Sequence, residues 1–170
     1  MEIRLLNESD AHSYQQVRLS ALKNNPEAFG STYEREAAYP LEFVASRLKP
    51  GEDQFVLGSF QDGGVLAGIV TFKREESPKM RHRGNVFAMY VAPEARGGGV
   101  GKSLLEELIR RAREADGLEQ IHLAVVTDNS SARKLYTSLG FEVYGTEPYA
   151  LKVGGKYYDE DLMVLRLESR

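Results

Sequence analysis

The stretch from Tyr90 to Ser103 constrains the fold of this 170-residue chain more than any other part of it. An apolar run at 86–91 ends in a turn marked by Pro93, and four of the five residues at 97–101 are glycines. An amphipathic helical pattern follows the glycines. A buried strand that passes through a glycine-rich turn into a helix is typical of α/β domains, so we expect a sheet covered by helices.

The same stretch predicts a binding site for an anion. Glycines tolerate positive φ and let other atoms approach the backbone closely. The first turn of a helix presents unpaired N–H groups and a partial positive charge, and Arg96 and Lys102 flank the loop with full positive charges. We interpret the loop as a seat for a phosphate or pyrophosphate. The alternative is an ordinary glycine-rich turn.

Two familiar phosphate-binding motifs do not fit the loop. A Walker A loop needs a leading glycine at position 96, which is Arg96, although residues 101–103 supply its Gly-Lys-Ser tail. The dinucleotide fingerprint needs a final glycine where this chain has lysine or leucine. The pattern that remains is Arg-x-x-Gly-x-Gly, read as Arg96, Gly99 and Gly101 between a strand and a helix.

This pattern resembles the acyl-CoA-binding signature of the GNAT N-acetyltransferase superfamily. The likeness begins in the strand before the glycines and continues into a later helix-and-strand segment. Clear similarity runs from about Val86 to Phe141, and a looser match extends over most of the chain. The later segment carries the resemblance at Asn129, Ala132, Leu135, Tyr136, Leu139, Gly140 and Phe141.

The resemblance implies one domain over residues 1–170 with a three-layer α/β/α fold. Its central sheet should have about seven strands of mixed direction, should splay apart beyond the fourth strand, and should be covered by about four helices. The alternating runs and two hairpin signals, at Asp62-Gly63 and at 153–156, independently favour a partly antiparallel sheet. We expect the second helical segment to continue through 41–48.

The implied activity is transfer of an acetyl group from acetyl-CoA to a primary amine of a small molecule, such as a polyamine or an amino acid. The amine would attack directly in a ternary complex, because the chain has no cysteine and no other obvious nucleophile for an acyl-enzyme. Two alternatives stay open: acetylation of a protein N-terminus or lysine, and a non-catalytic acyl-CoA-binding or sensor module. A nucleotide-binding protein is a third reading of the glycine loop.

Acetyl-CoA should lie against the glycine loop and the strand before it. The resemblance implies that pantetheine hydrogen-bonds to backbone groups of Met89 and Val91, as an added strand would, and that Asn129 binds the pantetheine arm. The full set of expected cofactor-binding residues is Met89, Tyr90, Val91, Arg96, Gly97, Gly98, Gly99, Val100, Gly101, Lys102, Ser103 and Asn129.

Tyr136 stands where many members of the superfamily carry their general acid. A phenol with an ordinary pKa of about 10 stays protonated and can donate to the departing thiolate. A backbone N–H near Val91 would donate a hydrogen bond to the oxyanion that forms when the amine attacks the thioester. Many relatives place a glutamate base where this chain has Asn85, so the base is not identified. The candidates left are Glu34, Glu36, His82 and a chain of water molecules.

The acceptor site is the least specified part. In the superfamily the region around residues 26–48 usually forms one wall of the acceptor groove, and the C-terminal hairpin usually supplies further contacts. We therefore expect Phe29, Tyr33, Glu34 and Tyr149 to contact the substrate, with core packing as the alternative for the aromatic rings. The acidic pair Glu34 and Glu36 favours a cationic acceptor.

Composition argues against several partners and cofactors. The net charge of −3 gives no basic field for nucleic acid or anionic lipid. No apolar run reaches the length of a membrane span, and the N-terminus lacks a signal-peptide pattern, so we expect a cytoplasmic protein. Three scattered histidines and no cysteine predict no metal site. Related enzymes are often dimers, which leaves a homodimer open.

Overall fold

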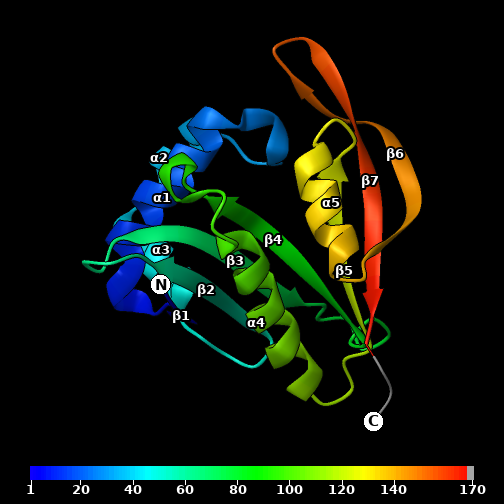
Figure 1. Cartoon of the computed structure of the whole chain (residues 1–170), viewed down its shortest axis with the longest axis horizontal. Helices are drawn as coiled ribbons and strands as arrows, with labels where there is room; N and C mark the ends of the chain where they lie inside the picture. Colours follow the sequence, from blue (N-terminus) through cyan, green and yellow to red (C-terminus); the bar gives the residue numbers. More distant parts are fainter. Residues whose placement is uncertain (168–170) are drawn as a thin grey trace.

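A seven-stranded sheet forms the centre of the fold in the computed structural model, which describes residues 1–167 (Figure 1). The strand order is β1-β2-β3-β4-β5-β7-β6. All neighbouring strands are antiparallel except β4 and β5, so the predicted mixed sheet is confirmed. The strands are β1 (Glu2–Leu5), β2 (Gln54–Phe60), β3 (Leu66–Arg74), β4 (Arg83–Val91), β5 (Gln120–Val126), β6 (Glu142–Val153) and β7 (Lys156–Arg166).

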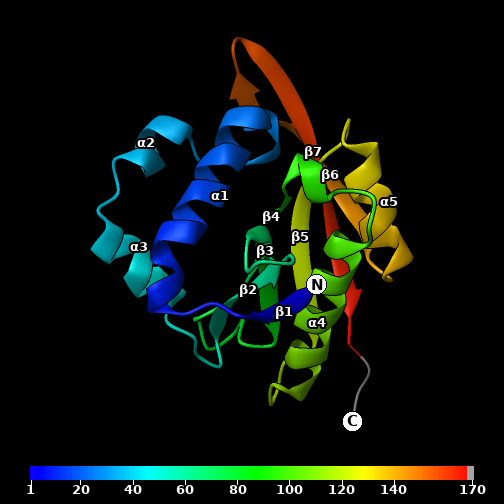
Figure 2. The same cartoon turned by 60° about the vertical axis from the view of Figure 1, so that its left-hand side comes forward.

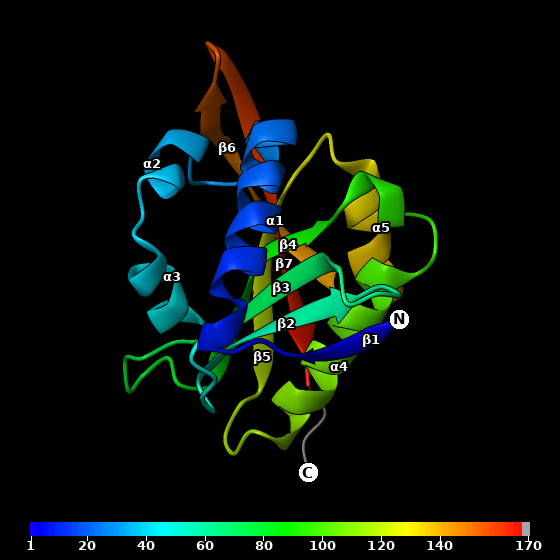
Figure 3. The same ribbon diagram turned by 90° about the vertical axis from the view of Figure 1, so that its left-hand side faces the viewer.

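Helices cover both faces of the sheet, which confirms the three layers (Figure 2 and Figure 3). Helices α4 (Val100–Glu114) and α5 (Ser130–Ser138) lie on one face. On the other face lie α1 (Ala11–Asn24), α2 (Tyr33–Ala37) and α3 (Leu41–Leu48). Short 3-10 turns are η1 (Glu8–Asp10), η2 (Pro26–Ala28) and η3 (Pro93–Ala95).

The described residues hold five α-helices where the sequence predicted about four. The extra helix arises because the segment expected to continue through 41–48 is interrupted. Pro40 has extended backbone angles, φ −60° and ψ 148°, and caps the start of α3. Proline disfavours the helical conformation in the residue before it, so α2 ends at Ala37 and a new helix begins after the proline.

Each face of the sheet has its own apolar core. Leucines on α4, of which Leu104 and Leu108 are completely buried, pack on the first face. Leu6 and Leu48 fill the second core beneath α1 and α3. Burying a leucine of this kind stabilises a fold by roughly 1.5–3 kcal/mol. The two cores hold the helical layers against the sheet.

Both predicted hairpins are present. The β6–β7 turn consists of Gly154 and Gly155, with φ of +57° and +80°, as expected for a two-residue hairpin turn that needs positive φ at both positions. The β2–β3 connection at 61–65 is longer, and its Gly63 and Gly64 also have positive φ. The β6–β7 hairpin projects beyond the rest of the sheet (Figure 1).

Strands β4 and β5 pair at one end only. Their parallel register runs from Arg83 opposite Gln120 to Asn85 opposite His122, and the strands then diverge (Figure 1). The predicted splay is therefore confirmed. Beyond Asn85 the edge of β4 that faces β5 has no strand partner, and this gap is where a ligand can enter the sheet.

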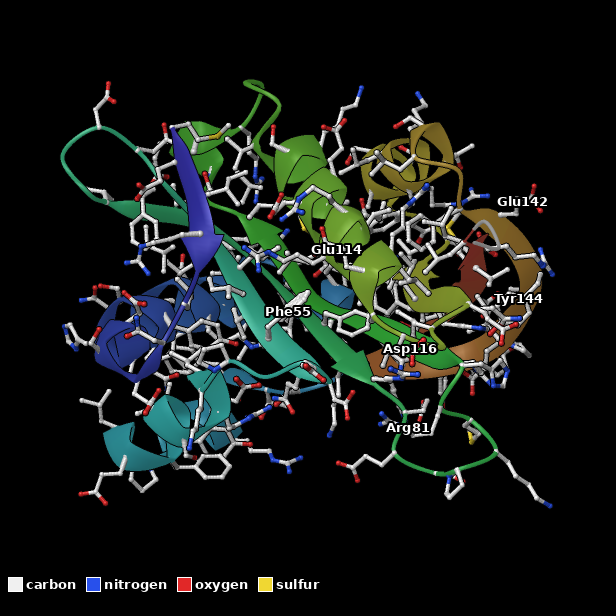
Figure 4. All side chains as sticks on the ribbon, turned by 90° about the horizontal axis from the view of Figure 1, so that it is seen from below. Phe55, Arg81, Glu114, Asp116, Glu142 and Tyr144 are labelled. Atoms are coloured by element: carbon white, nitrogen blue, oxygen red, sulfur yellow. The ribbon has the colours of Figure 1, made fainter. Side chains whose placement is uncertain are left out.

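Arg74 fastens the closed end of the splay. Its side chain is 9% exposed, and its guanidinium donates to the carbonyl oxygens of Arg81 (Nε) and, at 2.9 Å, Asp116 (Nη2). Figure 4, which views the molecule from this end, labels both of these residues. They belong to the loops that precede β4 and follow α4. The side chain of Arg74 therefore links these two loops at the closed end of the splay.

Candidate functional site

A cavity of about 1480 Å³ occupies the gap between β4 and β5. Its lining comes from both faces of the sheet: the glycine loop, α4 and α5 on one side, and α1, η2 and α2 on the other. Pockets for a single small ligand usually measure about 300–1,000 Å³. The cavity is therefore large enough for two ligands that meet inside the sheet from opposite faces.

The glycine loop is open toward this cavity. Gly97 and Gly99 have φ of +88° and +79°, a conformation that other residues adopt only with strain. A methyl group added at Gly97, Gly98 or Gly99 would meet nothing within 4 Å. The glycines therefore keep space free around the backbone, where a ligand can approach.

Gly101 has a different role in the same loop. A methyl group there would lie 3.1 Å from Met89 Cε and 3.3 Å from Leu135 Cδ2. This glycine lets the first turn of α4 pack closely on β4 and α5. The helix start is thereby held at the open end of the gap.

The start of α4 has the features of an anion site. Gly99 is the N-cap and cannot supply a capping side chain, so the first backbone N–H groups of the helix have no side-chain acceptor. Lys102 is exposed beside them. Arg96 is braced at the same place, because its Nε donates to Val91 O at 2.9 Å and its guanidinium lies 5.5 Å from the Tyr90 ring.

A bulge interrupts β4 where it borders the gap. Ala88 has φ +54°, and the pairing with β3 shifts register between Ile69 and Thr71. A non-glycine residue in this region costs roughly 1–2 kcal/mol, and such strain concentrates at functional sites. The bulge lies three residues before Val91, near which we expected the backbone N–H that binds the oxyanion.

The backbone of β4 after the bulge alternates between β3 and the gap. Ala92 N donates to Ala67 O at 2.7 Å, so Ala92 and Tyr90 face β3. Met89 and Val91 consequently turn their N–H and C=O groups toward the gap, where Val91 O already accepts from Arg96 Nε. This is the arrangement expected for hydrogen bonds to an extended ligand, and it places the Met89 N–H next to the bulge.

Tyr136 reaches the cavity from α5. Asn129 caps this helix by accepting from Ala132 N at 3.2 Å, and both Asn129 and Tyr136 line the cavity. Tyr136 is buried, packs edge-on against Phe141, and its hydroxyl makes no hydrogen bond to any group of residues 1–167. Burial raises the pKa of Tyr136 to about 12. The phenol is therefore a protonated donor that is free to bind a ligand.

The structure brings most of the predicted cofactor-binding residues to the cavity. Gly98 and Ser103 are the exceptions, since neither belongs to its lining. The ring of Tyr90 turns to the α1 face, where it meets Phe29 edge-on at 6.4 Å. The residues that do line the cavity are Met89, Tyr90, Val91, Arg96, Gly97, Gly99, Val100, Gly101, Lys102 and Asn129.

The predicted substrate residues separate into two groups. Phe29 lines the cavity, whereas Tyr33, Glu34 and Tyr149 do not. Tyr149 is 72% exposed on the projecting hairpin, and its ring lies at a tilt against that of Tyr157, with 4.8 Å between the ring centroids. Beside Phe29, this wall of the cavity is formed by residues outside the predicted substrate-binding set. Glu36, which we considered as a base, is one of them. They are Tyr14, Arg18, Glu36, Tyr39, Tyr158 and Glu160.

A buried ion pair lies in the wall opposite β4. Arg18 Nε and Nη2 donate to the two carboxylate oxygens of Glu36 at 2.9 and 3.0 Å, and the guanidinium lies 4.9 Å from the Phe29 ring. Burial opposes ionisation of Glu36, but the hydrogen bonds and charge of Arg18 outweigh it and lower the pKa of that carboxyl. Glu36 is thus already paired and is unsuited to accept a proton.

We expect Glu36→Gln to destabilise the protein by about 3 kcal/mol at pH 7, because it leaves the buried Arg18 charge without its counter-charge. Glu34→Gln, an exposed neighbour on α2, should change the free energy of unfolding by less than about 0.5 kcal/mol. Urea denaturation measures both. The lowered pKa of Glu36 means that its contribution is present above the ordinary glutamate pKa and is lost as pH falls through the folded-state pKa. An equal loss in the two variants would contradict this assignment.

Neither of the other side chains considered as a base lies in the cavity, and a histidine that was not considered does. Glu34 and His82 do not line the cavity. His122 does, but its Nε2 lies 2.9 Å from Gln120 Oε1 and its Nδ1 lies 3.3 Å from Tyr144 Oη. Burial and the charge of Arg83 lower the pKa of His122. Both ring nitrogens are therefore occupied by protein groups.

Residues 1–167 contain no group of three or more histidine, cysteine or carboxylate side chains placed to hold a metal ion. Within the same residues, every helix is too short or too polar to cross a bilayer.

Comparison with known proteins identifies the family. The family model described as "Acetyltransferase (GNAT) family" matches residues 17–141. The mycothiol acetyltransferase of Nocardiopsis dassonvillei is 37% identical over 56% of this chain, and the match covers 29% of that longer protein. The L-amino acid N-acetyltransferase AaaT of Escherichia coli is 28% identical over 91% of this chain and 93% of its own length.

The fold is also that of solved acetyltransferases. A GNAT superfamily phosphinothricin acetyltransferase from Sinorhizobium meliloti, crystallised with acetyl-CoA, superposes with a TM-score of 0.82. The two share 24% sequence identity, and the superposition covers 98% of this chain and 88% of the other. The likeness extends over the whole sheet and both helical layers.

Proposed function

The chain belongs to the acetyltransferase (GNAT) family, and on that premise we propose that it transfers an acetyl group from acetyl-CoA to a primary amine of a small molecule. The observation that carries the proposal is that one cavity reaches both faces of the sheet. On one face lies the start of α4, which has no capping side chain. On the other lie the side chains from α1, η2 and α2, which we call the acceptor wall. Such a cavity allows direct attack in a ternary complex, because the two substrates enter from opposite faces.

The residues around the glycine loop fit the phosphate groups of CoA. The free N–H groups at the start of α4 can bind the pyrophosphate, with Arg96 and Lys102 adding positive charge. Met89 and Val91 can pair with pantetheine as a neighbouring strand would. The open space around Gly97 and Gly99 supports this fit, because the seat needs no side chain to move before a ligand enters.

The proposed chemistry uses two hydrogen-bond donors from residues that line the cavity. The Met89 N–H faces the gap and is placed to bind the oxyanion that forms when the amine attacks the thioester. Tyr136 can donate its hydroxyl proton in a hydrogen bond to the departing sulfur. Both donors belong to buried or strained elements, so they are held in place before the reaction.

The charges of the wall favour an acceptor that carries a carboxylate, as an amino acid does. We expected a cationic acceptor from Glu34 and Glu36, but Glu34 lies outside the cavity and Glu36 is neutralised by Arg18. Relatives include an enzyme for L-amino acids, which agrees with this choice. The cations that line the acceptor side are Arg18, Arg35, Arg47, Lys73 and Arg83, against the carboxylates Glu27, Glu36, Asp128 and Glu160.

A free-thiol release assay with acetyl-CoA tests the proposal. The panel would compare L-amino acids, polyamines and short peptides with free N-termini. We expect amino acids to give the highest kcat/KM, because their carboxylate meets the cationic wall. Thiol release with peptides alone would favour the protein acetyltransferase, and acetyl-CoA binding by calorimetry without turnover would favour a sensor. Binding of ATP without binding of acetyl-CoA would overturn the proposal.

A further inference from the structure

Glu160 is a carboxylate of the cavity that neither the fold nor the cofactor site explains. It lies on β7, opposite Val126 of β5 and opposite Glu147 of β6. Side chains alternate along β7: Met163 and Leu165 belong to the core under α4 and α5. Glu160 points to the opposite face, toward the acceptor wall, and lines the cavity there.

The strand register places Glu160 across the gap from the bulge of β4. The last paired positions of β4 and β5 are Asn85 and His122, so three residues further along each strand brings Ala88 level with Val125. Glu160 lies on β7, level with the residue that follows Val125 on β5. Strand β7 is one strand further from β4 than β5 is. Those offsets correspond to roughly 3.3 Å along β5 and about 4.8 Å across to β7. The gap between β5 and β4 adds to this distance. An amine that Glu160 reaches, directly or through one water molecule, therefore lies inside the cavity between the two strands.

Glu160 lacks the ion pair that disqualifies Glu36. Among residues 1–167, its carboxylate lies within 4 Å of no lysine, arginine or histidine nitrogen. Burial and the charge of Glu147 raise the pKa of Glu160. Other charged or titratable side chains also line the cavity around the acceptor side. They are Arg18 of α1, Glu27 of η2, Arg35 and Glu36 of α2, Arg47 of α3, Lys73 of β3, Arg83 of β4, His122 of β5 and Asp128 after β5.

We propose that Glu160 is the general base of the acetyl transfer. As the amine nitrogen bonds to the acyl carbon, Glu160 takes the proton that this nitrogen loses, directly or through one water molecule. The C–S bond then breaks, and the sulfur leaves with the bonding electron pair beside the Tyr136 hydroxyl. Tyr136 donates its hydroxyl proton to the sulfur, so that CoA leaves as the thiol, and the proton held by Glu160 returns through solvent to the Tyr136 oxygen. This inference rests on the proposed function.

Replacing Glu160 tests the role of the carboxylate. Glu160→Gln keeps the size of the side chain but cannot accept a proton, so kcat should fall about 100-fold. The Kd for acetyl-CoA, measured by calorimetry, should be unchanged, because the cofactor seat lies on the other face. The control is Glu142→Gln on β6, whose exposed carboxylate makes the same charge change outside the cavity and should leave kcat unaltered.

A pH profile of kcat separates a base from a structural residue. Glu147→Gln removes the like charge opposite Glu160, so the acidic limb should move to lower pH while kcat at pH 8 is retained. The proposal is wrong if Glu160→Gln keeps wild-type kcat, or raises only KM, as a carboxylate that merely binds the ammonium would do. An acidic limb that stays in place in Glu147→Gln would also contradict it. If wild type itself acetylates no amine, the proposed function fails first, and this inference fails with it.

Discussion

Gly99→Asp should raise the Kd for acetyl-CoA about a thousand-fold while the protein stays folded. Gly99 is the N-cap of α4 with φ +79°, and the space around it is open. Aspartate tolerates this conformation better than most residues, and its carboxylate can cap the helix itself. It would then occupy the N–H groups that the pyrophosphate needs and would repel the phosphates. Losing two charge-assisted hydrogen bonds of about 2 kcal/mol each corresponds to that factor.

The matched control is Gly63→Asp in the β2–β3 loop. Gly63 also has positive φ, +84°, and open space, but it lies outside the cavity. Any backbone strain should therefore be similar in the two variants, and only Gly99→Asp should lose binding. Calorimetry with acetyl-CoA gives the Kd, and thermal unfolding verifies the fold. An unchanged Kd in Gly99→Asp would place the phosphates elsewhere.

The parts of the fold that the sequence predicts are those that local chemistry decides. Positive φ at Gly97 and Gly99, the turn at Gly154-Gly155 and the amphipathic helix α4 each follow from a few neighbouring residues. The splay between β4 and β5 could be predicted only from the family resemblance, because no local pattern specifies where a strand loses its partner. The break before α3 does have a local signal, which is the proline at position 40.

The acceptor wall was predicted poorly because its residues meet only in three dimensions. Tyr14 and Arg18 are one helical turn apart on α1, a spacing that hinted at a shared face, but nothing in the sequence pairs Arg18 with Glu36. On α2, a shift of two residues decides that Glu36 is buried and Glu34 exposed. A helix of five residues is too short for periodicity to fix which face turns inward.

The bulge at Ala88 and the placement of Glu160 illustrate the same limit. Ala88 is not a glycine and carries no sign of positive φ, so its strain is imposed by the register shift against β3. In the sequence, Glu160 is one of several consecutive charged residues at 159–161. Only the pairing of β7 with β5 and β6 shows which of these side chains faces the cavity. The residues that we propose to bind and activate the amine therefore had to be read from the structure, whereas the glycine loop and the helix start that follows it could be predicted.

Tyr136→Phe should lower kcat by two to three orders of magnitude and leave the Kd for acetyl-CoA within about twofold. The substitution removes one hydroxyl and keeps the ring that packs on Phe141, so the fold should be retained. Proton donation to a leaving group typically contributes 10²–10⁴-fold to an enzymatic rate. Stopped-flow thiol release measures kcat, and calorimetry measures the Kd.

The pH dependence of Tyr136→Phe provides a second and sharper test. Because burial raises the pKa of Tyr136 to about 12, the phenol stays protonated throughout the range in which the enzyme can be assayed. Any alkaline limb of kcat below about pH 11 must then belong to another group, and it should have the same midpoint in wild type and in Tyr136→Phe. If the limb disappears in the variant, Tyr136 loses its proton at lower pH than its burial implies. If kcat is unchanged instead, water rather than Tyr136 donates to the departing sulfur.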